Sequence, residues 1–463
     1  MTFGVIGIII SLFLLMYLAY RGVSILLLAP ILACFAVLMG GIGQPGSAHL
    51  MATYTETFMT SLGGYVRSYF PIFMLGAVFG KVMDDTGSAK SIATFICHKL
   101  GKEKAIIAIA SACAILTYGG VSLFVVAFAV YPVAAELFRE ANIPKRFVPA
   151  TIAIGAFTFT MTALPGTPQI QNAIPMAYFG TDVYAAPVLG IVASLIMYFG
   201  GIFWVQKRAA SAMAKGEGYG NHPNEKFAKF DLDKLPSISV ALLPIFVVLG
   251  MSFVLSKFVF PSMDLSYLVD YKTTASKVVG NWSLIISLGA SIIIALVCNA
   301  KRLESCLKTL TDGVSGSFLA IMNTASEVGY GNVISGLAAF AIVKGAILGL
   351  SSNPVVSEAI SVTTLAAITG SASGGLSIAL GALGETYARE AAAMGINPQV
   401  MHRIASVACG ALDTMPHNGA VITLLAATGL THRESYGDIA MCTAVIPVFS
   451  AIVIIILANF GVV

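Results

Sequence analysis

Long apolar runs separated by short polar segments dominate this 463-residue chain. Many of these runs reach the roughly 20 residues needed to cross the hydrocarbon core of a bilayer. They are too long for the strands of a membrane β-barrel, which alternate apolar and polar residues over about 10 positions. The pattern predicts an all-α integral membrane protein with about ten transmembrane helices, at residues 3–20, 22–41, 64–83, 146–178, 184–206, 236–258, 282–299, 313–335, 401–429 and 438–461.

Four apolar stretches are interrupted near their middle. Glycines interrupt residues 105–141 and 357–392, and proline-bearing polar loops interrupt residues 146–178 and 401–429. Glycine costs about 1 kcal/mol in a helix interior. Non-helical backbone at membrane depth is tolerated only where it is buried in protein or lines a wet cavity. We therefore expect two re-entrant hairpins from the first pair and two broken helices from the second.

One long polar segment, residues 206–235, divides the chain into residues 1–205 and 236–463. It mixes both charge signs with Gly, Asn and Pro, which is typical of a linker. Four segments recur in the same order on its two sides, which predicts an internal repeat. They are FGKVM with YGNVI, GGVSLFVVAF with GGLSIALGAL, REANIPKRF with AAAMGINPQVMHR, and GAFTFTMTALPGTPQIQN with GALDTMPHNGAV.

The basic residues predict an orientation. If the chain starts outside and both hairpins are re-entrant, most lysines and arginines, including those of the linker, lie on the cytoplasmic side. The positive-inside rule favours this arrangement. Each half then crosses the membrane an odd number of times, so the two repeats are inverted, as in many secondary transporters.

Composition agrees with a membrane protein and excludes several other classes. Hydrophobic residues make up 57% of the chain and charged residues 10%, whereas soluble domains carry about 25% charged residues. The first apolar run lacks a basic start and a cleavage site, so we expect a retained helix. The seven cysteines form no Cys-x-x-Cys pair and are expected to be packing residues. Without a nucleotide-binding motif or a basic aromatic surface, we expect no ATP coupling, no cofactor and no nucleic-acid partner.

The glycine pairs in LTYGGVS and TGSASGGLS place hydroxyl groups beside backbone that a hairpin tip leaves free. A tight helix contact through small residues is the alternative. Recurrence in both halves favours two hairpin tips that bind substrate. The candidate residues are Thr117, Tyr118, Gly119, Gly120 and Ser122 in the first tip, and Ser371, Ser373, Gly374, Gly375 and Ser377 in the second.

The proline-bearing loops TALPGTPQIQN and DTMPHNGAV are more polar than a simple proline kink, which is the alternative, requires. The half-helix that restarts after each loop points its N-terminus inward, where the macrodipole and free N–H groups favour an anion. Thr167 and Pro168 fit an N-cap and a first-turn proline. A small carboxylate is thus the expected ligand of Thr167, Gln169, Gln171 and Asn172 in the first loop, and of Thr414, His417 and Asn418 in the second.

Ionisable residues inside membrane helices are functional candidates by default. Asp413 and His417 lie four positions apart, and Glu327 lies in a polar-tinged helix of the second half. We expect Asp413, His417 and Glu327 to be candidates for carrying a coupling proton. The alternatives are that Asp413 only caps backbone N–H groups or pairs with His417, and that Glu327 pairs with another helix. No third ligand lies nearby in the sequence, so no metal site is expected.

The chain resembles the gluconate:proton symporter (GntP) family along essentially its whole length. The segments that carry the resemblance are TYGGVSLFVVAFAVYPVAAELFREANIPKRF, LPGTPQIQN and CGALDTMPHNGAVITLL. The resemblance implies proton-coupled uptake of a small hydroxy- or oxo-carboxylate across the bacterial inner membrane. It also implies a homodimer in which hairpins and broken helices move against a scaffold. The first loop carries no histidine, which favours the branch that resembles 3-hydroxybutyrate permeases over gluconate carriers.

The sequence therefore predicts a secondary transporter with elevator-type alternating access. Its expected substrate is a 3-hydroxybutyrate-like monocarboxylate first and a gluconate-like one second. A sodium-coupled carrier is the main alternative, because the Ser/Thr-Gly tips could supply oxygen ligands to Na⁺. A channel and a membrane-embedded enzyme are remote alternatives, since neither a filter nor a catalytic set is visible.

Overall fold

The computed structural model describes residues 2–42, 48–222, 235–349 and 351–463, and within these ranges it contains helices and no strands. In the first half the main helices are α1 (Thr2–Tyr20), α2 (Ile25–Gly41), α3 (Leu50–Ala52), α4 (Met59–Asp85), α5 (Ser88–Leu100), α6 (Ala105–Tyr118), α7 (Leu123–Glu140), α8 (Val148–Ala156), α9 (Phe159–Thr162), α10 (Ile170–Phe179) and α11 (Pro187–Ala214). In the second half they are α12 (Ile238–Val254), α13 (Phe260–Ser262), α14 (Ala275–Asn299), α15 (Cys306–Ser335), α16 (Phe340–Leu348), α17 (Pro354–Thr369), α18 (Ala372–Ala393), α19 (Pro398–Cys409), α20 (Gly419–Thr428), α21 (His432–Ala440) and α22 (Ile446–Asn459). The predicted all-α class is confirmed.

Six continuous helical segments in the described ranges are long and apolar enough to cross a membrane. A seventh candidate joins α15 and α16, which are bent by 100° relative to each other. The other predicted spans coincide with the shorter α2 and with two broken helices. The six segments are Thr2–Ala19, Leu50–Asp85, Pro187–Ala214, Ile238–Ser262, Ala275–Asn299 and His432–Asn459.

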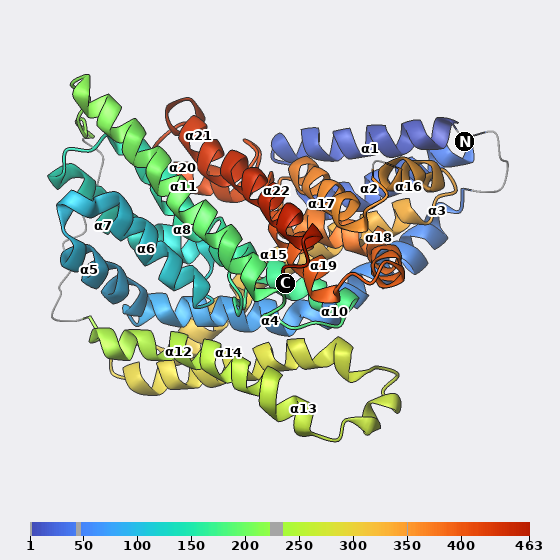
Figure 1. Cartoon of the computed structure of the whole chain (residues 1–463), viewed down its shortest axis with the longest axis horizontal. Helices are drawn as coiled ribbons and strands as arrows, with labels where there is room; N and C mark the ends of the chain where they lie inside the picture. Colours follow the sequence, from blue (N-terminus) through green and yellow to red (C-terminus); the bar gives the residue numbers. More distant parts are fainter. Residues whose placement is uncertain (1, 43–47, 223–234, 350) are drawn as a thin grey trace.

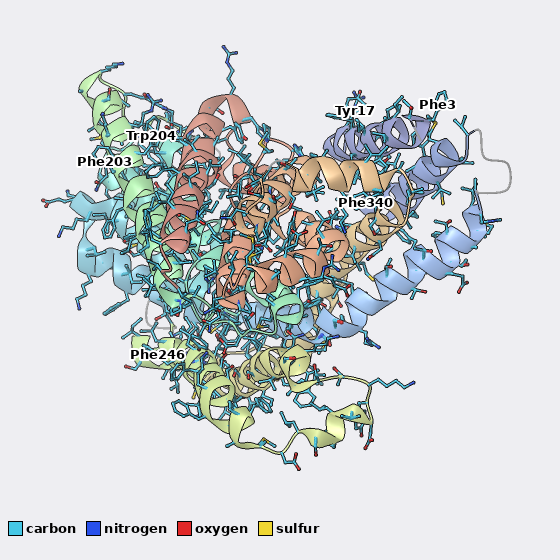
Figure 2. All side chains as sticks on the ribbon, turned by 45° about the vertical axis from the view of Figure 1, so that its right-hand side comes forward. Phe3, Tyr17, Phe203, Trp204, Phe246 and Phe340 are labelled. Carbon is cyan, nitrogen blue, oxygen red and sulfur yellow. The ribbon has the colours of Figure 1, made fainter. Side chains whose placement is uncertain are left out.

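The outer surface carries many large apolar side chains. Figure 2 shows Phe3 on α1, Phe203 on α11 and Phe246 on α12, and each is more than half exposed. Soluble monomers rarely leave contiguous apolar surface of this kind in water. The exposed apolar side chains are therefore suited to contact lipid.

Two predicted boundaries differ from the structure. The third span was expected from residue 64, but the helix starts at Leu50 and continues through a π-helical turn at Thr53–Phe58 into α4. The expected start was placed where the apolar run begins. The polar segment TYTET precedes that run, so the first turns of the helix were not predicted. Figure 1 shows the resulting long helix crossing the molecule alongside the α12–α14 pair.

The linker was expected from residue 206, but α11 continues to Ala214. Its last turns are anchored by Asp438 of α21, which accepts hydrogen bonds from Trp204 Nε1 at 3.0 Å and Arg208 Nε at 3.2 Å. Just beyond, hydrogen bonds from Arg146 hold the pKa of the Glu217 carboxyl below its ordinary value. Residues 223–234, most of the remaining predicted linker, lie outside the described residues.

Three of the four interruptions lie at the predicted glycine pair or proline-bearing loops. The second hairpin instead breaks at Gly370 and Ser371, and its predicted pair, Gly374 and Gly375, lies in the first turn of α18. Helices α6 and α7 meet at residues 119–122, and α17 and α18 meet at Gly370 and Ser371. A loop of residues 163–169 separates α9 from α10, and residues 410–418 separate α19 from α20. Gly120 has φ +98° and Gly370 has φ +61°, in the left-handed region that favours glycine. Each half thus contains a helical pair joined at a tip, followed by an interrupted helix.

Candidate substrate cavity between the broken helices

Asn418 connects the second tip to the second loop. Its side-chain oxygen accepts hydrogen bonds from the backbone N–H groups of Ala420 at 2.7 Å and Val421 at 3.0 Å, so it caps α20. Its amide nitrogen donates to the carbonyl oxygens of Gly370 and Asp413, both at 3.0 Å. One side chain therefore fixes the tip, the loop and the start of the half-helix together.

Gln169 makes a similar connection in the first half. It lies at the N-cap position of α10, and its amide nitrogen donates to the carbonyl oxygens of Thr117 at 2.8 Å and Val121 at 3.4 Å. These carbonyls belong to the first tip. In both halves, an amide side chain at the start of the half-helix is hydrogen-bonded to backbone of the neighbouring tip.

A cavity of about 620 Å³ lies beside the second tip and loop. Its walls come from both halves: the α1–α2 turn, α4, α7, α10, α15, the tip at residues 369–373 and the loop at residues 413–420. The volume is within the roughly 300–1,000 Å³ typical of small-molecule sites. The walls include the side chains of Glu327, Asp413 and His417 but no lysine or arginine.

Five cavity-lining side chains have a buried polar atom without a hydrogen-bond partner in the described structure. A buried polar group without a partner is costly, so such atoms around one cavity indicate a ligand or water. Four of the five atoms are oxygens and the fifth is a ring nitrogen. They are Gln171 Oε1, Asn323 Oδ1, Glu327 Oε2, Asp413 Oδ1 and His417 Nε2.

The carboxyl group of Glu327 lies against the first turn of α18. A Cβ atom at Gly374 would collide with this carboxyl group, so the glycine provides the space that the acid occupies. Likewise, a Cβ atom at Gly370 would lie 2.6 Å from Cδ2 of His417. Because these two glycines have no side chain, Glu327 and His417 can pack closely against the second tip.

A second cavity of about 230 Å³ adjoins the first. Gly120, Ser122 and Gln169 of the first tip and loop line it. The two cavities share the wall residues Phe73, Leu123, Phe124, Met161, Gln171 and Ala320. Residues of both tips thus converge on one connected region inside the protein.

The predicted site residues divide into two groups. Those lining one or both cavities are Gly120, Ser122, Gln169, Gln171, Glu327, Ser371, Ser373, Asp413, Thr414, His417 and Asn418. Those lining neither are Thr117, Tyr118, Gly119, Thr167, Asn172, Gly374, Gly375 and Ser377.

Three of the residues outside the cavities make hydrogen bonds within the protein. The hydroxyl group of Tyr118 donates to the carbonyl oxygen of Pro165 at 2.7 Å. Thr167 was expected to cap α10, but Gln169 holds that position, and the hydroxyl group of Thr167 donates to the carbonyl oxygen of Thr160 at 2.6 Å. Asn172 donates to two carbonyl groups of the first half, so its side chain is committed to holding the loop.

Arg403 of α19 is fully buried and was not among the predicted site residues. Its guanidinium donates to the carbonyl oxygens of Ala185 at 2.8 Å and Thr162 at 3.2 Å, and to Asn172 Oδ1 at 3.0 Å. Neighbouring His402 contacts the same oxygen of Asn172 and the hydroxyl group of Thr181. This network joins the second half to the loops around α10. The position of Arg403 and His402 inside the predicted span 401–429 was a signal, but the sequence did not indicate their partners, because most of the acceptors are backbone carbonyls.

Asn323 was also missed, although a signal existed. It lies four residues before Glu327, and this spacing places both side chains on one face of α15. Within the described residues, no group of three or more His, Cys, Asp or Glu side chains could hold a metal ion.

Comparisons with known proteins place this arrangement in a family context. The sequence model of the GntP family of permeases matches residues 1–460. The uncharacterized transporter YxjC of Bacillus subtilis (strain 168) is 44% identical over 454 residues, which cover 95% of each chain.

Two solved transporters have a similar fold at low sequence identity. Neisseria gonorrhoeae MtrF, which represents a class of antimetabolite efflux pumps, has a TM-score of 0.54 and 12% identity over 94% of each chain. The Alcanivorax borkumensis YdaH transporter has a TM-score of 0.50 and 17% identity, and covers 89% of this chain and 90% of its own.

Proposed function

Because the chain belongs to the GntP family of permeases, and is therefore a multi-pass membrane transporter rather than an enzyme, we propose that it couples uptake of a small hydroxy-monocarboxylate to protons. The preferred substrate is 3-hydroxybutyrate-like, and a gluconate-like acid comes second. The site is the pair of adjoining cavities between the two tips. The protein acts in the bacterial inner membrane, as a homodimer.

The observation that carries this proposal is the charge of the larger cavity. Glu327 and Asp413 line it, with no lysine or arginine in its wall. Two like charges roughly 5 Å apart, at an effective dielectric constant of about 20, repel each other by about 3 kcal/mol. A carboxylate would therefore be repelled by either acid in its ionised form. A substrate anion binds stably only when these acids carry protons. This requirement couples the transport of the substrate to the transport of protons.

The attraction for the anion comes from helix ends rather than from basic side chains. The N-termini of α18 and α20 both begin at the larger cavity, where Ser371, Ser373 and Gly419 line its wall. Helix N-termini favour anions through the macrodipole. This attraction does not need the N–H groups of Ala420 and Val421, which already donate to Asn418. A neutralised pair of acids beside two such termini forms a suitable environment for one carboxylate.

The hydrogen bonds around the tips support movement as one body. Asn418 and Gln169 each hold a tip to its half-helix, and Arg403 ties α19 to the loops around α10. Tips that opened independently would have to break these bonds. Elevator-type transport, in which both hairpins and both broken helices move together against the remaining helices, keeps them intact. The similar order of elements in the two halves supports an internal repeat. The odd number of crossings proposed for each half makes the two repeats inverted.

The orientation proposed from the basic residues puts the α1–α2 turn on the cytoplasmic side. Residues 22–25 of this turn line the larger cavity, so the structure corresponds to an inward-facing state under this proposal. A cysteine placed at Ser24 tests the orientation: it is expected to react with a membrane-impermeant thiol reagent only from the cytoplasmic side. Labelling from outside alone contradicts the orientation.

The substrate class is tested by counterflow in proteoliposomes loaded with single acids. Labelled 3-hydroxybutyrate is expected to exchange against 3-hydroxybutyrate and, more slowly, gluconate, but not against neutral sugars. Exchange of neutral sugars without exchange of any carboxylate contradicts the proposal. The matched control uses liposomes of the same lipids without the protein, which give the background exchange.

A further inference from the structure

Asn323 projects into the larger cavity from α15, one turn before Glu327. Its side-chain oxygen is buried and has no partner among the described residues. Asn281 also has a buried side-chain oxygen without a partner in the described part of the chain, but it does not line the cavity. Asn332, on the same helix, donates to the carbonyl oxygen of Val328 at 3.1 Å, and Asn418 makes four hydrogen bonds. The free amide oxygen of Asn323 differs from that of Asn281 because it lies in a cavity wall, where a ligand can reach it.

Gln171 supplies a second amide oxygen of the same kind. It belongs to the first turn of α10, in the other half of the chain, and lines both cavities. Its Oε1 atom is also buried without a partner. The two amides thus reach the same cavity from opposite halves, and neither is needed to satisfy another group of the protein.

The chemistry of these two side chains differs from that of the acids. An amide is neutral at all relevant pH values and presents both a donor and an acceptor. A hydroxyl group has the same dual character, so it can donate to the amide oxygen and accept from an amide N–H. The neighbouring wall residues Phe73, Leu123, Met161 and Leu319 are apolar and suit a short hydrocarbon chain. The cavity therefore offers separate places for a carboxylate, a carbon chain and a hydroxyl group.

We propose that Asn323 and Gln171 bind the hydroxyl group of the substrate and thereby select hydroxy acids over unsubstituted acids of the same length. This inference rests on the proposed function and adds to it the residues that set specificity. A site built to hydrogen-bond a hydroxyl group rejects an analogue that lacks it, because the buried partners of the site are then left unpaired.

The test compares 3-hydroxybutyrate with butyrate as competitors of labelled 3-hydroxybutyrate uptake in proteoliposomes. The wild-type protein is expected to prefer 3-hydroxybutyrate by about tenfold or more. Asn323→Leu and Gln171→Leu are each expected to reduce this preference toward equality, mainly by raising the KM for the hydroxy acid. Asn332→Leu, on the same helix but outside the cavity, is expected to keep the wild-type preference.

Equal inhibition of the wild-type protein by the two acids overturns the inference. This comparison does not depend on whether any variant folds. An unchanged preference in both leucine variants overturns it as well. The absence of uptake or competition for every carboxylate instead contradicts the proposed function, so the two failures are distinguishable. Asn323→Gln, which restores an amide at a shifted position, is expected to recover part of the preference lost in Asn323→Leu.

Discussion

The side-chain amide of Asn418 donates to the carbonyl oxygen of Gly370, 3.0 Å away, across 48 residues of sequence. The same side chain caps α20. The second tip and the second half-helix therefore share one polar anchor.

Replacement of Asn418 separates these two roles. Asn418→Ser keeps a side-chain oxygen for the helix cap but removes the amide donors, so we expect strongly reduced uptake with a small loss of stability. Asn418→Ala loses both roles and is expected to cost about 0.5–2 kcal/mol more through the cap. Initial uptake rates and thermal unfolding in detergent measure the two effects. Asn397→Ser, at the cap of α19, is the control, and wild-type uptake by Asn418→Ser contradicts the anchor.

Neutralising the acids is expected to separate exchange from accumulation. In Asp413→Asn, and separately in Glu327→Gln, the carboxyl group that would carry a proton is replaced by an amide of similar size. We expect counterflow to persist within about an order of magnitude while gradient-driven accumulation is lost. Asp264→Asn, in an exposed loop, should accumulate substrate normally. Accumulation at the wild-type level by both single variants would reduce the acids to structural residues.

Gly374 provides room for the carboxyl group of Glu327, and this fit predicts a steric effect. Gly374→Ala places a methyl group where the carboxyl group lies, so we expect impaired uptake. Gly381 is seven residues further along the same helix, and a Cβ atom there would lie 3.8 Å from the nearest atom, an ordinary contact. Gly381→Ala is therefore the matched control and should transport normally. Similar uptake rates in the two variants disprove the tight fit around Glu327.

The buried guanidinium of Arg403 predicts a stability effect. Lysine keeps the charge but cannot reach the carbonyl oxygens of Ala185 and Thr162 together, because it lacks the planar fork. Leaving buried carbonyl groups unpaired costs about 1–3 kcal/mol each, so Arg403→Lys should lower the unfolding temperature by several degrees. Arg389→Lys, at an exposed position of α18, should change it little. An unchanged unfolding temperature in Arg403→Lys excludes Arg403 as the link between the halves.

Local signals predicted most of the helix breaks. Gly120 and Gly370 adopt left-handed backbone that few other residues tolerate. Proline alone is not sufficient, because α2, α4 and α10 each continue through a proline; the loops at Pro165 and Pro416 were recognised by the polar residues beside them. The matching order of tips and loops in the two halves indicated that the breaks belong to a repeated structural unit. For the same reason, Glu327, Asp413 and His417 were identified from their rarity in apolar surroundings, and they line one cavity in the structure.

Long-range packing could not be predicted in the same way. Nothing in the sequence around Asn172 distinguishes a ligand-binding amide from one that holds a loop, because its partners are carbonyl groups and α19 side chains from distant positions. The partners of Asn172 depend on which surfaces meet in three dimensions, and apolar periodicity does not encode this. Helix α5 was missed for a different reason: the expected helices were set from long apolar runs, and lysines interrupt the apolar residues of α5.

The central claim is that protons, and not sodium ions, drive the uptake of the substrate. Transport under imposed ion gradients tests it most directly. Proteoliposomes that contain the purified protein receive an inward proton gradient without sodium, or an inward sodium gradient at equal pH on both sides. The account predicts that labelled 3-hydroxybutyrate accumulates above equilibrium only with the proton gradient, and that a proton ionophore abolishes this accumulation. Accumulation driven by sodium alone, and insensitive to the ionophore, would contradict it.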